Sequence, residues 1–275
     1  MTYRNHLSPP TFPYAWASDW GEDRYGLWQA FTYQDVRHAF RWIQPGTFQM
    51  GSPETEKERW EDEDLHHVTV MYGFWLAETT VTQALWQTVM DDNPSLFKGD
   101  NRPVDSVDWE DTQTFIIKLN HIHTDLKVRL PWEAEWEYAC RAGTQTSFNF
   151  SEELSLERVN YSGKWDDAGD DNRAKNATTD VKTYACNNWG LYEMHGNTSE
   201  WCADEWQEFL GKEDAVFNLF QCKVRPNAET GLGFTRVIRG GSWSSRGTNV
   251  RSAIRLGEDP RHTDSDIGFR LALVP

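Results

Sequence analysis

The sequence predicts a single domain of mixed helices and strands in which much of the backbone is irregular. Strand-like alternation of apolar and polar residues occurs near both ends of the chain, and three helical patterns lie between them. From residue 144 to about residue 236 the periodicity fades, and Asn, Asp, Gly and Thr dominate. No repeat or linker divides the chain. We expect residues 1–40 to be an N-terminal extension packed on a domain formed by residues 41–275.

The composition indicates a folded protein and excludes some classes of partner. Hydrophobic residues make up 38% of the chain and 15 residues are Trp, so a packed core is expected. Large rigid rings suit irregular backbone because they anchor loops that regular elements do not. A net charge of -16 disfavours binding to nucleic acid or to an anionic membrane, both of which require a positive face.

The sequence also predicts a cytoplasmic location. No stretch approaches the roughly 20 apolar residues of a membrane helix, and the first 20 residues lack the basic and apolar regions of a signal peptide. Four cysteines are too few for a disulfide framework. We expect reduced, buried structural thiols at Cys140, Cys186, Cys202 and Cys222.

In the first part of the domain, alternation over residues 40–52 predicts a hairpin with Pro45 and Gly46 at its turn. The acidic residues 54–64 are interpreted as a solvated loop. Alternation over residues 67–76 predicts a strand.

Three segments have helical spacing. Residues 80–92 predict a helix with Thr80 or Thr82 as its N-cap, and residues 108–120 predict one capped by Asp108. Residues 131–143 have Pro at the start and Gly just past the end of a helix.

Near the C-terminus, residues 235–243 and 266–274 predict strands. In the second strand Ile267, Phe269, Leu271 and Leu273 share one face.

Nine motifs are spread in a fixed order along the chain, at residues 46–52, 74–75, 78–82, 93–95, 103–104, 129–139, 190–201, 239–243 and 268–270. Together they resemble the formylglycine-generating-enzyme family, also called the sulfatase-modifying-factor family. The resemblance spans about residue 40 to the end. It implies an α+β fold with a C-type-lectin-like arrangement and limited regular secondary structure.

The resemblance does not extend to the catalytic sulfur atoms. Members that convert a sulfatase cysteine to formylglycine use two cysteines after the Gly-Gly-Ser motif, where soft thiolates bind copper(I). Here Ser245 lies roughly where the first cysteine would be, and no cysteine follows Cys222. Because a hydroxyl cannot replace a thiolate as a soft-metal ligand, we expect no catalytic residue and no copper.

A second chemistry of the superfamily is iron-dependent carbon–sulfur bond formation, which draws its histidines from an additional helical domain that this sequence lacks. Two histidine clusters remain, His66 with His67 and His121 with His123. Without converging carboxylates, exposed or hydrogen-bonded histidines are favoured over metal ligands.

Residues 193–200 resemble the structural calcium loop of the family. Side-chain oxygens at the first and eighth positions and backbone carbonyls at the fourth and sixth would surround the ion. Carried over, the ligands are Glu193, Gly196, Thr198 and Glu200. The family often has Asp or Asn at the first position, and the alternative is that Glu200 only caps or hydrogen-bonds loop amides. Asn160 is a candidate for a second calcium site.

The C-terminal segment mixes two kinds of residue. The framework set resembles fixed family positions: Arg239, Gly240, Gly241, Ser242, Trp243, Arg251, Ser252, Ala253, Arg255, Pro260, Gly268, Phe269 and Arg270. The interspersed set is mostly small and polar, and each member is reachable from an asparagine codon by changing adenines only. It comprises Ser244, Ser245, Arg246, Gly247, Thr248, Asn249, Ile254, Leu256, Gly257, Arg261, His262, Thr263, Asp264, Ser265 and Asp266.

This substitution rule is typical of diversity-generating retroelements, whose variable proteins use the same fold and diversify this segment. The sequence therefore predicts a non-catalytic variable protein whose interspersed set binds a protein or other macromolecular ligand. Short polar side chains lose little entropy on binding and offer adaptable hydrogen bonds. The alternatives are an undiversified binding or scaffold member, an oxidoreductase resembling the formylglycine-generating enzyme, and a solvated loop without a partner.

Overall fold

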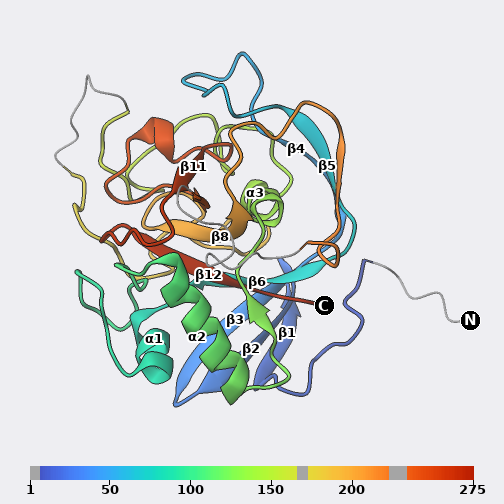
Figure 1. Ribbon diagram of the computed structural model, residues 1–275, viewed down its shortest axis with the longest axis vertical. Helices are drawn as coiled ribbons and strands as arrows, with labels where there is room; N and C mark the ends of the chain where they lie inside the picture. The colour runs from blue at the N-terminus through green and yellow to red at the C-terminus, as the bar shows by residue number, and fades with distance from the viewer. Residues whose placement is uncertain (1–6, 166–172, 223–233) are drawn as a thin grey trace, which may run out of the picture.

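The computed structural model describes residues 7–165, 173–222 and 234–275, and its elements run through the chain in a mixed order (Figure 1). The strands are β1 (Asp19–Asp23), β2 (Gly26–Tyr33), β3 (Val36–Ile43), β4 (Gly46–Met50), β5 (His66–Val70), β6 (Phe74–Thr80), β7 (Val128–Arg129), β8 (Ser199–Glu205), β9 (Ala215–Phe217), β10 (Arg236–Arg239), β11 (Arg255–Glu258) and β12 (Ile267–Leu273). The helices are α1 (Gln83–Met90), α2 (Trp109–Ile122), α3 (Glu133–Arg141) and the 3₁₀ turn η1 (Gly247–Asn249).

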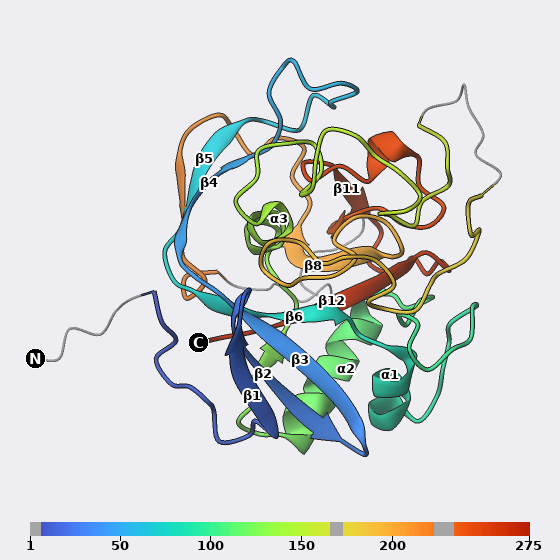
Figure 2. The ribbon, with the colours of Figure 1, turned by 180° about the vertical axis from the view of Figure 1, so that it is seen from behind.

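Two sheets organise the described residues. The larger has the order β1-β2-β3-β6-β12-β8-β10-β11, with β7 also paired to β12, and the smaller has the order β4-β5-β9. Strands β8 and β12 pair in parallel, whereas the other neighbours in the larger sheet are antiparallel. In Figures 1 and 2, β6 and β12 cross the middle of the molecule. Helices α1 and α2 lie on one side of them, and α3 lies with the irregular segments on the other.

All three predicted helices are confirmed, and side-chain caps explain where α1 and α2 begin. The Thr82 hydroxyl accepts from the Leu85 amide and caps α1, while Asp108 and Asp111 form a reciprocal capping box at the start of α2. Helix α3 ends at Ala142, whose φ of 46° lies in the left-handed region, and Gly143 follows with φ of 88°.

Two strand predictions are corrected by the pairing. Residues 40–43 and 46–50 are extended as predicted, but they do not form a hairpin with each other. Strand β3 pairs with β2 and β6, and β4 pairs with β5. Likewise residues 67–76 are not one strand, because β5 and β6 belong to different sheets. Alternation shows that a segment is extended, but the partner depends on contacts that are distant in sequence.

The N-terminal residues contribute to the larger sheet. Strands β1 and β2 and most of β3 lie within residues 1–40, so the boundary predicted at residue 40 falls inside β3. Phe31 and Phe40 are fully buried in the main hydrophobic core. Residues 1–6 lie outside the described part.

Strand β12 separates two hydrophobic clusters. Ile267, Phe269, Leu271 and Leu273 pack into the cluster that contains residues of α1 and α2, which confirms their predicted common face. Ala272 packs into the cluster that contains residues of α3. Both faces of β12 are therefore covered.

Residues 144–236 are largely irregular where the structure describes them, but they contain β8 and β9. Strand β8 lies between β12 and β10, so a central strand was missed by the sequence prediction. Among the described helices, none is both long and apolar enough to cross a bilayer.

Candidate ligand-binding surface

The predicted framework set is almost entirely buried. Of its thirteen members, twelve are buried and Trp243 is half-buried. The four arginines of this set each pair with a carboxylate from another part of the chain: Arg239 with Glu137, Arg251 with Glu63, Arg255 with Glu133, and Arg270 with Glu200. A buried charge is tolerated when it is paired and hydrogen-bonded. The four ion pairs therefore fix the path of the C-terminal segment.

Helix α3 supplies two of these carboxylates. Glu133 and Glu137 are one helical turn apart, so both face the C-terminal segment. The two bonds from Arg255 to Glu133 measure 2.7 and 2.8 Å, the bidentate geometry that arginine favours. Burial raises the pKa of Glu133, but the charge and hydrogen bonds of Arg255 outweigh burial and leave it below its ordinary value. The carboxylate is therefore charged at neutral pH.

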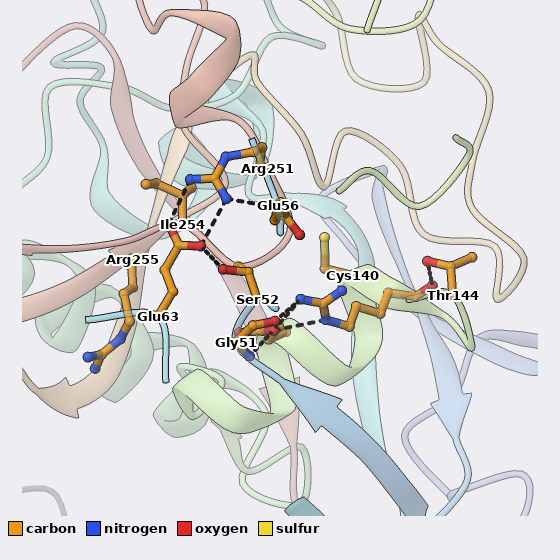
Figure 3. A network of polar contacts seen from close by, with 12 residues as sticks. Gly51, Ser52, Glu56, Glu63, Cys140, Thr144, Arg251, Ile254 and Arg255 are labelled. Atoms are coloured by element: carbon orange, nitrogen blue, oxygen red, sulfur yellow. Dashed lines mark hydrogen bonds and ion pairs between the residues drawn. The ribbon is translucent and has the colours of Figure 1, made fainter. Parts of the chain in front are cut away.

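The pair of Arg251 and Glu63 anchors the acidic loop beneath the C-terminal segment (Figure 3). The Arg251 guanidinium donates to both Glu63 oxygens at 2.6 and 2.9 Å and to Glu56 Oε1 at 2.7 Å. The Ser52 hydroxyl donates to Glu63 Oε2 at 2.6 Å. The interpretation of residues 54–64 as a solvated loop was therefore wrong for Glu63 and Asp64, which are buried, and for Glu56, which is partly covered.

The interspersed set divides by exposure. Seven members are exposed: Ser244, Arg246, Gly257, Arg261, His262, Thr263 and Asp264. Five are half-buried: Ser245, Asn249, Leu256, Ser265 and Asp266. Gly247, Thr248 and Ile254 are buried, which corrects their assignment to a displayed surface, because Ile254 is 1% exposed and Thr248 is 8% exposed.

Two glycines of this set contact tryptophan rings closely. A Cβ atom at Gly257 would lie 2.5 Å from Trp206 Cγ, and one at Gly247 would lie 2.7 Å from Trp165 Cε3. Both distances are far below ordinary contact. Substitution at either position therefore requires a ring to move, even though Gly257 is itself exposed.

Hydrogen bonds join the two ends of the displayed segment. The hydroxyls of Ser242 and Ser244 both donate to Asp266 Oδ2, the former at 2.8 Å. The Trp243 indole donates to the Ser265 carbonyl at 3.1 Å, and the Ser106 amide donates to the Asp264 carbonyl at 2.9 Å. Residues 244–246 and 261–266 are thus connected parts of one structure rather than separate loops.

At the position predicted for the first catalytic cysteine, Ser245 is part of this hydrogen-bonded turn. Its hydroxyl oxygen accepts from the Ser242 amide at 2.9 Å. The four cysteines are free thiols. Cys140 and Cys202 are buried as expected, whereas Cys186 and Cys222 are half-buried. Burial raises the pKa of Cys140 to about 12, so this thiol is not a thiolate at neutral pH.

The predicted calcium ligands do not fit a calcium ion as they lie. The Glu200 carboxylate is fully buried and accepts from Arg270 at 2.8 Å and from the Trp136 indole at 2.7 Å, so a guanidinium already neutralises it. Glu193 accepts from the backbone amides of Lys182 and Tyr184.

A third predicted ligand, the carbonyl of Gly196, is also engaged within the chain. The Gly196 carbonyl accepts from the Thr198 amide at 2.9 Å. The described residues contain no cluster of three His, Cys, Asp or Glu side chains that could hold a metal. At the candidate second site, Asn160 Oδ1 is buried without a described hydrogen-bond partner.

Three of the four clustered histidines are hydrogen-bonded or exposed, as favoured from the sequence, whereas the Nε2 atom of half-buried His123 has no described hydrogen-bond partner. His66 is buried with Nδ1 2.8 Å from the Asp64 carbonyl, and exposed His67 lies 3.3 Å from Asp214. His121 is exposed, and His123 packs against the rings of Phe31 and Tyr33.

Comparison with known proteins identifies the family. The domain described as sulfatase-modifying factor enzyme 1-like matches residues 29–274. The chain belongs to this family. The formylglycine-generating enzyme of Mus musculus is 30% identical over 218 residues, which are 76% of this chain and 53% of that enzyme. This chain thus spans about half the length of the mouse relative.

Two solved structures support the α+β fold of C-type-lectin-like type. Treponema denticola variable protein 1 has a TM-score of 0.74 and 25% identity, covering 90% of this chain and 99% of that one. PvdO from Pseudomonas aeruginosa has a TM-score of 0.69 and 26% identity, covering 88% and 97%. A variable protein is therefore a structural neighbour of this sulfatase-modifying-factor-like chain.

The sequence prediction did not identify the carboxylates that support the surface. Glu63, Glu133 and Glu137 stand in segments rich in acidic residues, where most acidic side chains are solvated. The one feature of the sequence that could have indicated them is the number of glutamates in α3. This short helix has three, and all three are buried.

Proposed function

We propose that this protein is a non-catalytic member of the family that binds a macromolecular ligand through the exposed residues of its C-terminal segment. The observation that carries the proposal is the contrast in burial along residues 239–270. Framework residues are buried and fixed by four ion pairs, while seven interspersed residues are exposed on the resulting rigid support. Rigid support lowers the entropy lost on binding.

The similarity to Treponema denticola variable protein 1 supports a diversified surface. The ligand is then a protein or another macromolecule, and the net charge of -16 disfavours nucleic acid and anionic membrane. Arg246, Arg261 and His262 are the large exposed side chains of the surface and are the expected main contributors to affinity. Half-buried Leu256 adds an apolar contact.

Two randomised libraries displayed on yeast test this proposal. The first varies Arg246, Arg261, His262 and Thr263, and is selected against lysozyme as an arbitrary protein target. We expect surface expression close to wild type and recovery of binders, because these side chains face solvent.

The control library varies the three buried members of the set, Gly247, Thr248 and Ile254. We expect most of its clones to lose expression, because substitutions there disturb the packing. Equal expression loss in both libraries, or no binder from a well-expressed first library, would contradict a displayed binding surface.

The oxidoreductase alternative has its own test. The protein is incubated with a Cys-x-Pro-x-Arg peptide, copper and oxygen, beside the formylglycine-generating enzyme of Thermomonospora curvata, which is 30% identical over 213 residues. Mass spectrometry should detect aldehyde only with that enzyme. Aldehyde formed by this protein would overturn the non-catalytic assignment.

The undiversified alternative is separated from the diversified one by the coding DNA. A nearby copy of the 3′ end that differs only at adenines, together with a reverse-transcriptase gene, supports diversification. Their absence from the locus would leave a binding or scaffold member with a fixed surface.

A further inference from the structure

A cavity of the described residues lies outside the C-terminal segment. It has a volume of about 760 Å³ and is formed by residues 144–151, 157–159 and 184–195. This volume is within the range of sites for small organic molecules. None of the interspersed residues lines it, so it is separate from the proposed macromolecular surface.

The cavity has a mixed lining, in which apolar side chains lie beside polar ones such as buried Asn187 and His195 and beside one buried carboxylate. Val159, Leu191 and Met194 are at most 2% exposed and form apolar lining, and the half-buried rings of Phe150 and Tyr184 also line it. Glu193 lines the same cavity and is 9% exposed. A ligand with an apolar body and one charged group matches this composition.

Glu193 differs from every other buried glutamate that the structure describes. The six others each form an ion pair with arginine: Glu63 with Arg251, Glu78 with Arg41, Glu133 with Arg255, Glu135 with Arg129, Glu137 with Arg141, and Glu200 with Arg270. Glu193 accepts hydrogen bonds only from backbone amides, at 3.1 Å from Lys182 and 3.3 Å from Tyr184. A buried carboxylate without a cation is costly.

The nearby cations are already paired elsewhere. The Lys182 ammonium lies 2.5 Å from Glu78 Oε2, and Arg270 is bound to Glu200. Arg158 also lines the cavity, but it is exposed and its guanidinium lies 5.0 Å from the centre of the Phe150 ring. Within the described residues, no cation forms an ion pair with Glu193; burial raises the pKa of its carboxyl to about 7, and the charge of Arg270 only partly offsets this.

We propose that this cavity is a binding site for a small organic cation, in which an ammonium group pairs with Glu193 and an apolar or aromatic body fills the cavity. The ammonium supplies the charge that arginine supplies to the other six glutamates. The rings of Phe150 and Tyr184 offer further favourable contact, because aromatic faces attract cations.

Isothermal titration calorimetry with 2-phenylethylamine tests the proposal, and 2-phenylethanol is the neutral probe of the same shape. We expect the amine to bind and the alcohol to bind at least about tenfold more weakly, since a hydrogen bond to a charged group contributes about 1.5–3 kcal/mol. Glu193→Gln should weaken binding of the amine by the same factor. The matched control is Glu153→Gln, an exposed glutamate that does not line the cavity, and it should leave the affinity unchanged.

Circular dichroism and thermal melting check that both variants are folded. Failure of the amine to bind, equal affinity for the alcohol, or an unchanged affinity in Glu193→Gln would each overturn the proposal. A third titration uses calcium chloride. Displacement of the amine by calcium at Glu193 would also overturn it, by showing that the carboxylate serves a divalent ion.

Discussion

Replacement of Arg251 by Met should strongly destabilise the protein, because it removes the cation that holds Glu63 in the interior. Arg251 and Glu63 are 0% and 1% exposed. The substitution deletes three hydrogen bonds to carboxylates, at 2.6, 2.7 and 2.9 Å, and two to the carbonyls of Glu58 and Thr248. Removing one partner of a buried ion pair costs about 3–5 kcal/mol, and we expect a loss in that range.

The loss should depend on pH in a defined direction. In the wild type, burial raises the pKa of Glu63, but the bonds and charge of Arg251 outweigh burial and lower it below its ordinary value. The charged form is therefore favoured by folding, and stability rises as pH rises through the acid range. In the variant only burial remains, so the pKa rises and stability falls with pH. The deficit of Arg251→Met should be larger at pH 7 than at pH 4.

Urea denaturation followed by tryptophan fluorescence measures this difference. Arg261→Met is the matched control: Arg261 belongs to the same segment, but it pairs with Asp259 in solvent and its loss should not change stability measurably. Adding Glu63→Gln to Arg251→Met should restore part of the lost stability, because it removes the unpaired charge. A deficit below about 1 kcal/mol, or an equal deficit at both pH values, would refute the role assigned to Arg251.

Three further outcomes are expected. His38 is buried, and burial together with the charge of Arg270 lowers its pKa to about 3. Because the folded protein keeps His38 neutral where the unfolded chain is protonated, on the order of 4 kcal/mol of stability should be lost between pH 6.5 and pH 3. Denaturation across that range should show this loss in the wild type but not in His38→Phe. Gly257→Val should destabilise by about 1–3 kcal/mol because of the contact with Trp206, and a penalty that persists in a Trp206→Ala background would show that the ring is not its cause. Because Arg270 already neutralises the Glu200 carboxylate, chelator should leave the melting temperature unchanged, and a fall would place a structural ion in the protein.

Local patterns in the sequence were sufficient for the helices. Thr82 and Asp108 cap α1 and α2 as predicted, because a cap depends on residues only a few positions away. Strand β12 was also predicted, since its apolar residues alternate. In contrast, the pairing of β3 with β6 joins residues more than 30 positions apart, and no local pattern encodes that choice.

The candidate surface was predicted in part. The sequence separated a framework set from an interspersed set, and the structure buries twelve of the thirteen framework residues. It could not show that Gly247, Thr248 and Ile254 are covered, because their neighbours come from other segments. Trp165 and Leu154, for example, close over Gly247.

The sequence by itself determined the family, since the ordered motifs are a property of the chain, and it determined the absence of a cysteine after Cys222. The tertiary structure alone decided which charges are buried together. Arg251 and Glu63 are 188 positions apart, and their attraction becomes strong only where folding removes water from around both groups. The same burial leaves Glu193 without a cation partner among the described residues, which no pattern in the sequence indicates.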